Sequence, residues 1–135
     1  MAKRMLQLGR PTAIPATPDE AVLDRVRNPH TDTTYLARFT FPEFTVMCPV
    51  TGQPDFATIT ITYVPDQLCV EMKSLKLYFL AYRNKGIFYE AVVNTILDDL
   101  VSKLSPRSMT VVGDFAARGG TVGTVTASFR AGDKG

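Results

Sequence analysis

The chain has 135 residues, of which 45% are hydrophobic and 21% charged, as in an ordinary soluble protein with one folded domain. Its 15 basic and 13 acidic residues leave a net charge of only +2, which disfavours a nucleic-acid-binding protein. No apolar run approaches the roughly 20 residues of a membrane span, and residues 1–10 lack the apolar centre of a signal peptide. We therefore expect a cytoplasmic protein with neither a nucleic acid nor a membrane as its partner.

The first part of the chain is predicted to be an extended N-terminal arm, residues 1–34, followed by a single domain, residues 35–135. The arm contains four prolines and no sustained hydrophobic periodicity. Within it, residues 19–26 can form one or two helical turns, with Thr17 or Asp19 as the cap. His30, the only histidine, is expected in a surface turn.

Two strands are predicted between residues 35 and 64. Aromatic and β-branched residues dominate 35–47, with a break at Pro42. In the second strand, residues 56–64, apolar and threonine side chains alternate with a period of two. The apolar side chains of this strand, expected to face the core, are Ala57, Ile59, Ile61 and Tyr63.

Two helices are predicted to follow. Residues 67–73 are extended in character and lead to Ser74, which can cap a first helix that ends near residue 83. A second helix is predicted over residues 88–104 and is closed by Pro106. Its apolar residues recur at every fourth position, which indicates one buried face. These residues are Phe88, Val92, Ile96, Leu100 and Leu104.

The remaining residues predict two more strands, 108–116 and 121–129, joined by a turn that contains Arg118. The element order is therefore strand, strand, helix, helix, strand, strand. This order favours an α+β fold with a four-stranded antiparallel sheet and two consecutive helices on one of its faces. Because the second sheet face and the edges remain uncovered, we expect self-association.

The segment 48–55, Cys-Pro-Val-Thr-Gly-Gln-Pro-Asp, is a rigid loop with a nucleophile and a proton carrier at its ends. Cys48 is either a small buried apolar residue or a nucleophile that a neighbour activates. Asp55 either stabilises the turn or acts as a general acid or base. We favour the functional interpretation of both. Cys69, in an apolar segment, is expected in the core, and the absence of zinc-site spacing predicts no metal.

Two carboxylates stand in apolar surroundings, Glu71 and Glu90. Each can be a surface residue, and Glu90 also suits the positive end of the second helix. Alternatively, a carboxylate pairs with a guanine-like N–H edge. The basic residues are surface charges or phosphate contacts, and no glycine-rich nucleotide-binding loop is present. The candidates for phosphate contacts are Lys73, Lys76, Arg83 and Arg118.

Residues 71–78, Glu-Met-Lys-Ser-Leu-Lys-Leu-Tyr, and the loop beginning Cys-Pro-Val-Thr-Gly-Gln-Pro-Asp-Phe-Ala resemble two motifs of one family. That family is the NADPH-dependent nitrile reductases that act on 7-cyano-7-deazaguanine in queuosine biosynthesis, a tRNA modification. Tyr-Arg-Asn at 82–84 and Arg-Gly-Gly at 118–120 resemble it too. The resemblance covers about residues 28–121, and it implies a tunnelling fold. It also implies rings with active sites between subunits, and a homodecamer made of two pentamers.

The resemblance further implies a mechanism. The Cys48 thiolate adds to the nitrile carbon to give a thioimidate, Asp55 donates the proton, and two NADPH molecules deliver hydrides in turn. Glu90 pairs with the guanine-like edge of the deazapurine. The implied pocket-lining residues are Val70, Glu71, Met72 and Tyr89, and the implied cofactor contacts are Lys73, Ser74 and Lys76, with Arg118 on the phosphates.

The chain departs from the family motifs at three positions. Met72 stands where serine or leucine is preferred, and Ala117 stands where proline is common. Tyr89 stands where histidine is frequent, and a phenol with a pKa of about 10 is a poor proton shuttle at neutral pH. Two alternatives remain open: a tunnelling-fold amidinotransferase of archaeosine synthesis, and a non-catalytic ring that binds a purine or RNA.

Overall fold

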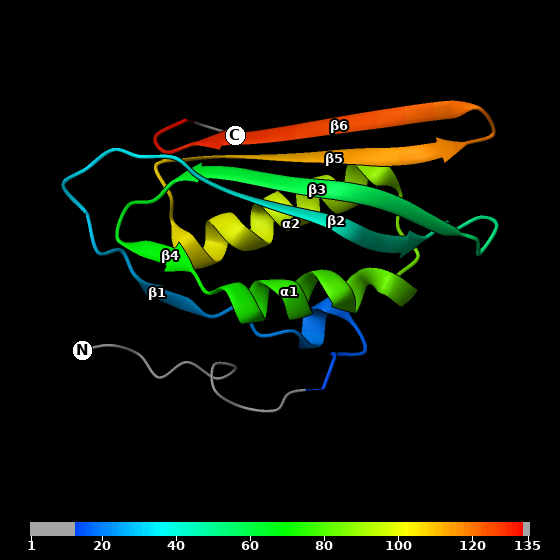
Figure 1. Cartoon of the computed structure of the whole chain (residues 1–135), viewed down its shortest axis with the longest axis horizontal. Helices are drawn as coiled ribbons and strands as arrows, with labels where there is room; N and C mark the ends of the chain where they lie inside the picture. The colour runs from blue at the N-terminus through cyan, green and yellow to red at the C-terminus, as the bar shows by residue number, and fades with distance from the viewer. Residues whose placement is uncertain (1–12, 134–135) are drawn as a thin grey trace.

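The computed structural model describes residues 13–133, which form one sheet layer and one helix layer (Figure 1). The sheet has four antiparallel strands in the order β2-β3-β5-β6. Helices α1 and α2 cover the same face of this sheet (Figure 1). The predicted α+β architecture and its element order are therefore confirmed. The bounds are β2 (Ala37–Met47), β3 (Pro54–Val64), α1 (Met72–Leu80), α2 (Tyr89–Leu104), β5 (Ser108–Arg118) and β6 (Thr121–Arg130).

Strand β3 is an inner strand of the sheet, and its apolar side chains pack the sheet against the helices. Its apolar residues alternate toward the helices, and Ile59 and Ile61 are completely buried. Helix α2 comes so close to β5 that a Cβ atom on Gly113 would lie 2.8 Å from Val93 and 2.9 Å from Phe115. Glycine therefore permits the tight helix-to-sheet contact there. Pro42 coincides with a register shift between β2 and β3, as the predicted break suggested.

The start of α1 differs from the prediction. Glu71, not Ser74, is the N-cap, and its carboxylate accepts the backbone N–H groups of Lys73 at 2.8 Å and Ser74 at 2.9 Å. The helix therefore begins two residues before the predicted cap. Ser74 is completely buried, where its hydroxyl accepts the N–H of Asp24 and donates to the carbonyl of Glu71, each at 2.9 Å. A carboxylate reaching two free N–H groups explains why the cap lies at Glu71.

The predicted helical turns at residues 19–26 are wrong. A single short turn, η1 (Pro18–Glu20), is followed by strand β1 (Arg25–Arg27), and Thr17 makes no capping bond. Strand β1 pairs with β4 (Leu68–Val70), and Leu23 is buried in the core, so tertiary contacts outweigh local helix propensity here. Residues 1–12 of the predicted arm lie outside the described residues. Within residues 13–133, no helix is both long and apolar enough to cross a membrane.

Candidate active site

The Cys48 loop is a closed turn between β2 and β3. The N–H of Cys48 donates to the carbonyl of Gln53 at 2.8 Å, and the N–H of Gly52 donates to the carbonyl of Cys48 at 2.9 Å. Gly52 has a φ of 70°, a conformation that glycine adopts at little cost. These bonds hold Cys48 half-exposed at the end of β2, so the thiol is both fixed and accessible.

A short segment brings the start of α2 to the same place. Residues 85–87 run beside the end of β2, where Met47 donates to the carbonyl of Lys85 at 2.9 Å and accepts from Ile87 at 3.1 Å. The chain before this segment is a short helix, η2 (Ala81–Asn84). The β2–β3 turn, the β5–β6 turn and the start of α2 thus share one end of the molecule (Figure 1).

Arg118 connects the end of β5 to the β2–β3 turn. It is the last residue of β5, directly before the turn at Gly119 and Gly120. Its Nη1 pairs with the carboxylate of Asp55, and its Nη2 donates to the Thr51 hydroxyl and to the Gln53 side-chain oxygen, each at 2.8 Å. One guanidinium, at the end of β5, therefore bonds both the Cys48 loop and the start of β3.

The environment of Cys48 lowers the pKa of its thiol to about 7. The largest cause is a hydrogen bond from the Thr51 side chain, followed by the backbone N–H groups of Thr51 and Val50. The positive charge of Arg118 acts in the same direction, while partial desolvation opposes it. A considerable fraction of Cys48 is therefore thiolate at neutral pH, which is the nucleophilic form.

Asp55 is buried at the start of β3, close to Tyr89 as well as to Arg118. The Tyr89 ring stacks on Phe115 with 3.7 Å between centroids and 11° between planes. Desolvation is the largest cause of a raised pKa of Tyr89, followed by the charge of Asp55 and hydrogen bonding to it, while Arg118 opposes the rise. Tyr89 is therefore a protonated donor at neutral pH, held in one orientation by its stacked ring.

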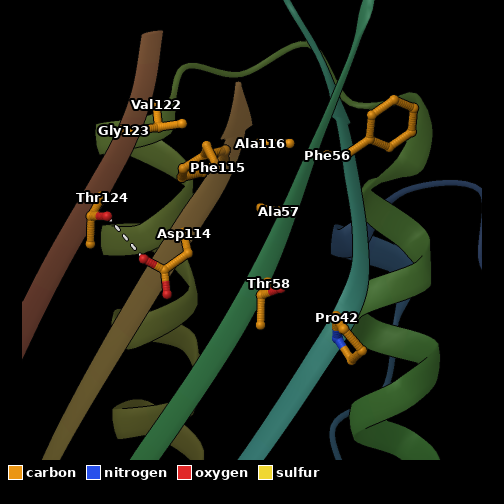
Figure 2. A pocket seen from close by; sticks show the side chains of 10 residues that line it. All are labelled: Pro42, Phe56, Ala57, Thr58, Asp114, Phe115, Ala116, Val122, Gly123 and Thr124. Atoms are coloured by element: carbon orange, nitrogen blue, oxygen red, sulfur yellow. Dashed lines mark hydrogen bonds between the residues drawn. The ribbon is translucent and has the colours of Figure 1, made fainter. Parts of the chain in front are cut away.

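Two adjoining hollows open at this end. One, of about 370 Å³, contains the Asp55–Arg118 pair. The other, of about 410 Å³, lies on the open sheet face, where the Asp114 carboxylate accepts from Thr124 at 2.9 Å (Figure 2). Only the first contains charged groups of the Cys48 site, so we take it as the candidate active site. Its lining residues are Gln53, Pro54, Asp55, Phe56, Ala116, Ala117 and Arg118.

The structure brings five of the predicted site residues to this end. Arg118 pairs with Asp55 and bonds the loop that carries Cys48. Tyr89 lies close to these two charged groups, and Glu90 is exposed in the first turn of α2. The other six span the end of β4 and the first half of α1, and α1 begins far from the end that carries the Cys48 loop (Figure 1). A single chain therefore does not bring these six to Cys48. They are Val70, Glu71, Met72, Lys73, Ser74 and Lys76.

The accessibility of these six residues differs. Met72 and Lys76 are exposed, and Lys73 is half-buried. Val70 is buried and its N–H donates to the Tyr63 hydroxyl at 3.0 Å. Glu71 and Ser74 are also buried, in the cap described above. Met72, Lys73 and Lys76 are therefore more accessible to a ligand or a neighbouring molecule than the three buried residues.

Thr51 and Gln53 were not predicted as site residues. Both lie in the recognised loop, but their contacts come from Arg118, which is 67 and 65 positions away, so no local pattern reveals them. Phe88 was assigned to the buried face of α2, and this was wrong. It is 56% exposed at the N-cap, beside Tyr89 and Glu90. Helix α2 starts at Tyr89, so Phe88 has an extended backbone and its side chain does not follow the buried face of the helix.

Comparison with known proteins identifies the family of the chain. Residues 54–134 match the family described as QueF-like protein. The NADPH-dependent 7-cyano-7-deazaguanine reductase of Methylorubrum extorquens (strain PA1) is 59% identical over 114 residues, which are 84% of this chain and 74% of that protein. The enzyme of the same name from Prosthecochloris aestuarii is 52% identical over 113 residues, 84% of this chain and 96% of that protein.

A solved structure shares the fold. The archaeosine synthase QueF-Like in the apo form superposes with a TM-score of 0.68, covering 76% of this chain and all of that one. Its sequence identity of 18% makes this a likeness of fold alone, and it confirms the predicted tunnelling fold. The relatives with high sequence identity show which of the families with this fold the chain belongs to. The chain belongs to the family of NADPH-dependent 7-cyano-7-deazaguanine reductases.

Proposed function

We propose that this chain reduces the nitrile group of 7-cyano-7-deazaguanine to an aminomethyl group, the nitrile-reduction step of queuosine biosynthesis. The observation that carries the proposal is the pairing of Asp55 with Arg118, whose guanidinium also bonds the Cys48 loop, together with the Cys48 thiol pKa of about 7. Such a thiol is a nucleophile matched to neutral pH. The relatives named for this reaction supply the substrate.

The first step joins Cys48 to the substrate. The thiolate adds to the nitrile carbon, a C–S bond forms, one C–N π bond breaks, and the nitrogen takes up a proton, giving a thioimidate. In this step the Asp55 carboxylate, paired with Arg118, first takes up a proton from the Cys48 thiol or from water and then delivers it to the nitrogen. The Tyr89 hydroxyl beside it is a protonated neighbour. In this proposal Tyr89 orients Asp55 and holds a proton beside it, instead of acting as a histidine-like shuttle.

The later steps return Cys48 to its thiolate form. NADPH, when bound, supplies hydride, and two equivalents are needed to convert the nitrile to an amine. Between the two, the C–S bond breaks and its electron pair stays on the Cys48 sulfur. The second proton enters through the same Asp55 side of the pocket. The low pKa of Cys48 also makes it a good leaving group.

Recognition of the base is assigned to the start of α2. The guanine-like edge of the substrate presents N–H donors, and the exposed Glu90 carboxylate is purely an acceptor. Phe88 offers an exposed apolar ring next to it, suited to the flat deazapurine. The site thus has an acceptor and an aromatic surface on one element, and the nucleophile on another.

The residues of α1 reach this site in our proposal from a neighbouring subunit of a ring. Two observations support assembly. Among the described residues, β6 and all of β2 except Met47, which pairs with residues 85–87, are open edges of the four-stranded sheet. Large apolar side chains are also exposed at the catalytic end. A homodecamer of two pentamers remains a prediction. The exposed apolar side chains at this end are Val50, Phe56, Phe88 and Val122.

The cofactor contacts follow from the same arrangement. Lys73 and Lys76 of the neighbouring α1 are suited to phosphate groups of NADPH. Ser74 is fully buried and Arg118 already pairs with Asp55, so in this proposal they support the site instead of binding phosphate. We place the reaction in the cytoplasm, where a free thiol such as Cys48 is kept reduced.

The test is NADPH oxidation by the purified protein. We expect oxidation only when 7-cyano-7-deazaguanine is present, with two NADPH consumed per nitrile. Cys48→Ala abolishes it, while Cys69→Ala, a matched loss of the other thiol, retains it. Oxidation without the nitrile, or full activity of Cys48→Ala, would contradict the proposal.

A further inference from the structure

Arg118 directs the hydrogen-bond donors of its guanidinium at residues of its own chain. Each terminal nitrogen of a guanidinium carries two N–H groups and has no acceptor. Nη2 donates to the Thr51 hydroxyl and to the Gln53 side-chain oxygen, each at 2.8 Å. Nη1 pairs with Oδ1 of Asp55. Both N–H groups of Nη2 are therefore occupied, and this nitrogen has none left for an incoming phosphate.

The two acceptors of Nη2 belong to the closed turn that carries Cys48. The Thr51 hydroxyl also accepts the N–H of Gln53 at 3.3 Å, and the carbonyl of Gln53 accepts the N–H of Cys48 at 2.8 Å. The turn therefore presents both oxygens to Arg118 at fixed positions. Because both are neutral, the carboxylate of Asp55 is the group that matches the charge of Arg118.

Asp55 depends on this arrangement because it is buried. Its side chain is 6% exposed, whereas the side chain of Arg118 is 32% exposed. A buried carboxylate is costly without a counter-charge, and a long exposed side chain loses entropy when it is held in one geometry. The bonds to Thr51 and Gln53 offset that loss, since they hold the guanidinium in place. Removing either acceptor therefore loosens Arg118 and, through it, Asp55.

We propose that Thr51 and Gln53 are positioning residues that hold Arg118 in place. Arg118 is thereby a fixed partner of Asp55 in the proton-transfer step and not a contact for the phosphates of NADPH. This inference rests on the proposed function. Because Nη1 engages Oδ1 of Asp55, Oδ2 is the oxygen that takes up the proton and delivers it to the nitrile nitrogen.

The test combines two measurements: the rate of adduct formation with 7-cyano-7-deazaguanine in the absence of NADPH, and the binding of NADPH in the absence of nitrile. Gln53→Met removes the acceptor and keeps the length of the side chain. We expect it to slow adduct formation by about tenfold, as for one lost hydrogen bond to a charged group, and to change the Kd of NADPH less than about twofold. Thr51→Val acts in the same direction. Gln67→Met, the same substitution at an exposed residue between β3 and β4, changes neither quantity.

Arg118→Lys shows whether Gln53 acts through Arg118, because it retains the charge but not the planar fork. In this background we expect Gln53→Met to slow adduct formation by less than about twofold more. An equal loss in both backgrounds means that Gln53 acts on its own and overturns the proposal. An unchanged adduct rate in Gln53→Met overturns it too.

Arg118→Gln tests the phosphate assignment, since it removes the charge. We expect its Kd for NADPH to stay near the wild-type value. Binding weaker by about tenfold or more would make Arg118 a phosphate contact and overturn the proposal.

The proposed function and this inference fail separately. A wild-type protein that forms no adduct contradicts the proposed reductase, and with it the proton-transfer role of Arg118. The hold of Gln53 on Arg118 is measured without any activity by thermal unfolding. We expect the shift in unfolding midpoint caused by Gln53→Met to be largely lost in the Arg118→Lys background. Equal shifts in the two backgrounds overturn the positioning role.

Discussion

At the scale of single residues, the site depends on contacts that cross the whole sequence. Arg118 bonds Asp55, Thr51 and Gln53 from 63 to 67 positions away. The loop therefore acquires its final electrostatic environment only when the β5–β6 hairpin is in place. The low pKa of Cys48 itself comes mainly from Thr51 and Val50 of its own loop, and Arg118 makes a smaller contribution in the same direction.

The pH dependence follows from the Cys48 pKa of about 7. Addition to the nitrile needs the thiolate, which is present above this pKa and is lost as the pH falls through it. We expect the single-turnover rate of thioimidate formation to fall by close to tenfold per unit below about pH 6. A rate that is independent of pH between 5 and 8 would contradict an activated Cys48.

Tyr89 is the residue where this chain departs from the frequent histidine. Tyr89→Phe removes the hydroxyl that bonds Asp55 and keeps the ring stacked on Phe115. We expect kcat to fall by about tenfold or more, within the range for loss of a group that assists proton transfer. The unfolding midpoint is expected to change little, which separates this effect from misfolding. Unchanged kcat would assign Tyr89 to packing alone.

At the scale of elements, the contact between α2 and β5 is tight at Gly113. Gly113→Ala places a methyl group 2.8 Å from Val93 and 2.9 Å from Phe115. We expect the free energy of unfolding to fall by about 1–3 kcal/mol, as for other overpacked cores, measured by denaturant titration. Gly123→Ala is the matched control, because its nearest neighbour would be the Tyr89 ring at 3.7 Å. Equal stability of the two variants would contradict the predicted overpacking.

The sequence predicted those helices and strands whose own residues alternate or repeat with a clear period. The alternation in β3 and the fourfold repeat of α2 gave their burial correctly from Val92 onward. The errors fall where a partner distant in sequence decides. Strand β1 exists because it pairs with β4, and Ser74, the predicted cap, bonds Asp24 from 50 positions away while Glu71 caps α1. Local patterns do not contain this information.

The candidate site was predictable in part for the same reason. Cys48 and Asp55 are close in sequence, so one rigid loop suggested their pairing. The pairing of Asp55 with Arg118, the nearness of Tyr89, and the bond from Arg118 to Thr51 depend on the tertiary structure. The other predicted site residues, within 70–76, came from the resemblance to a family. Their distance from Cys48 within one chain could not be predicted from it.

At the scale of the whole molecule, this separation predicts a shared active site. Cys48→Ala and Lys76→Glu change opposite ends, and each variant alone is expected to be inactive. Mixed rings regain about a quarter of wild-type activity per chain, since random assembly restores one intact pairing in four. Co-expressed variants with distinct tags supply these rings for the NADPH assay. No recovery in confirmed mixed rings would contradict a site built from two subunits.

The most direct test of the central claim is the intact mass of the protein incubated with 7-cyano-7-deazaguanine, with and without NADPH. Without NADPH we expect each wild-type chain to gain the mass of one nitrile molecule, because addition to Cys48 releases no atom, and Cys48→Ala to gain nothing. NADPH should restore the original mass as the amine forms. An absent adduct, or the same adduct on Cys48→Ala, would contradict the account. An adduct that persists while NADPH is never oxidised would instead favour transfer to an amine.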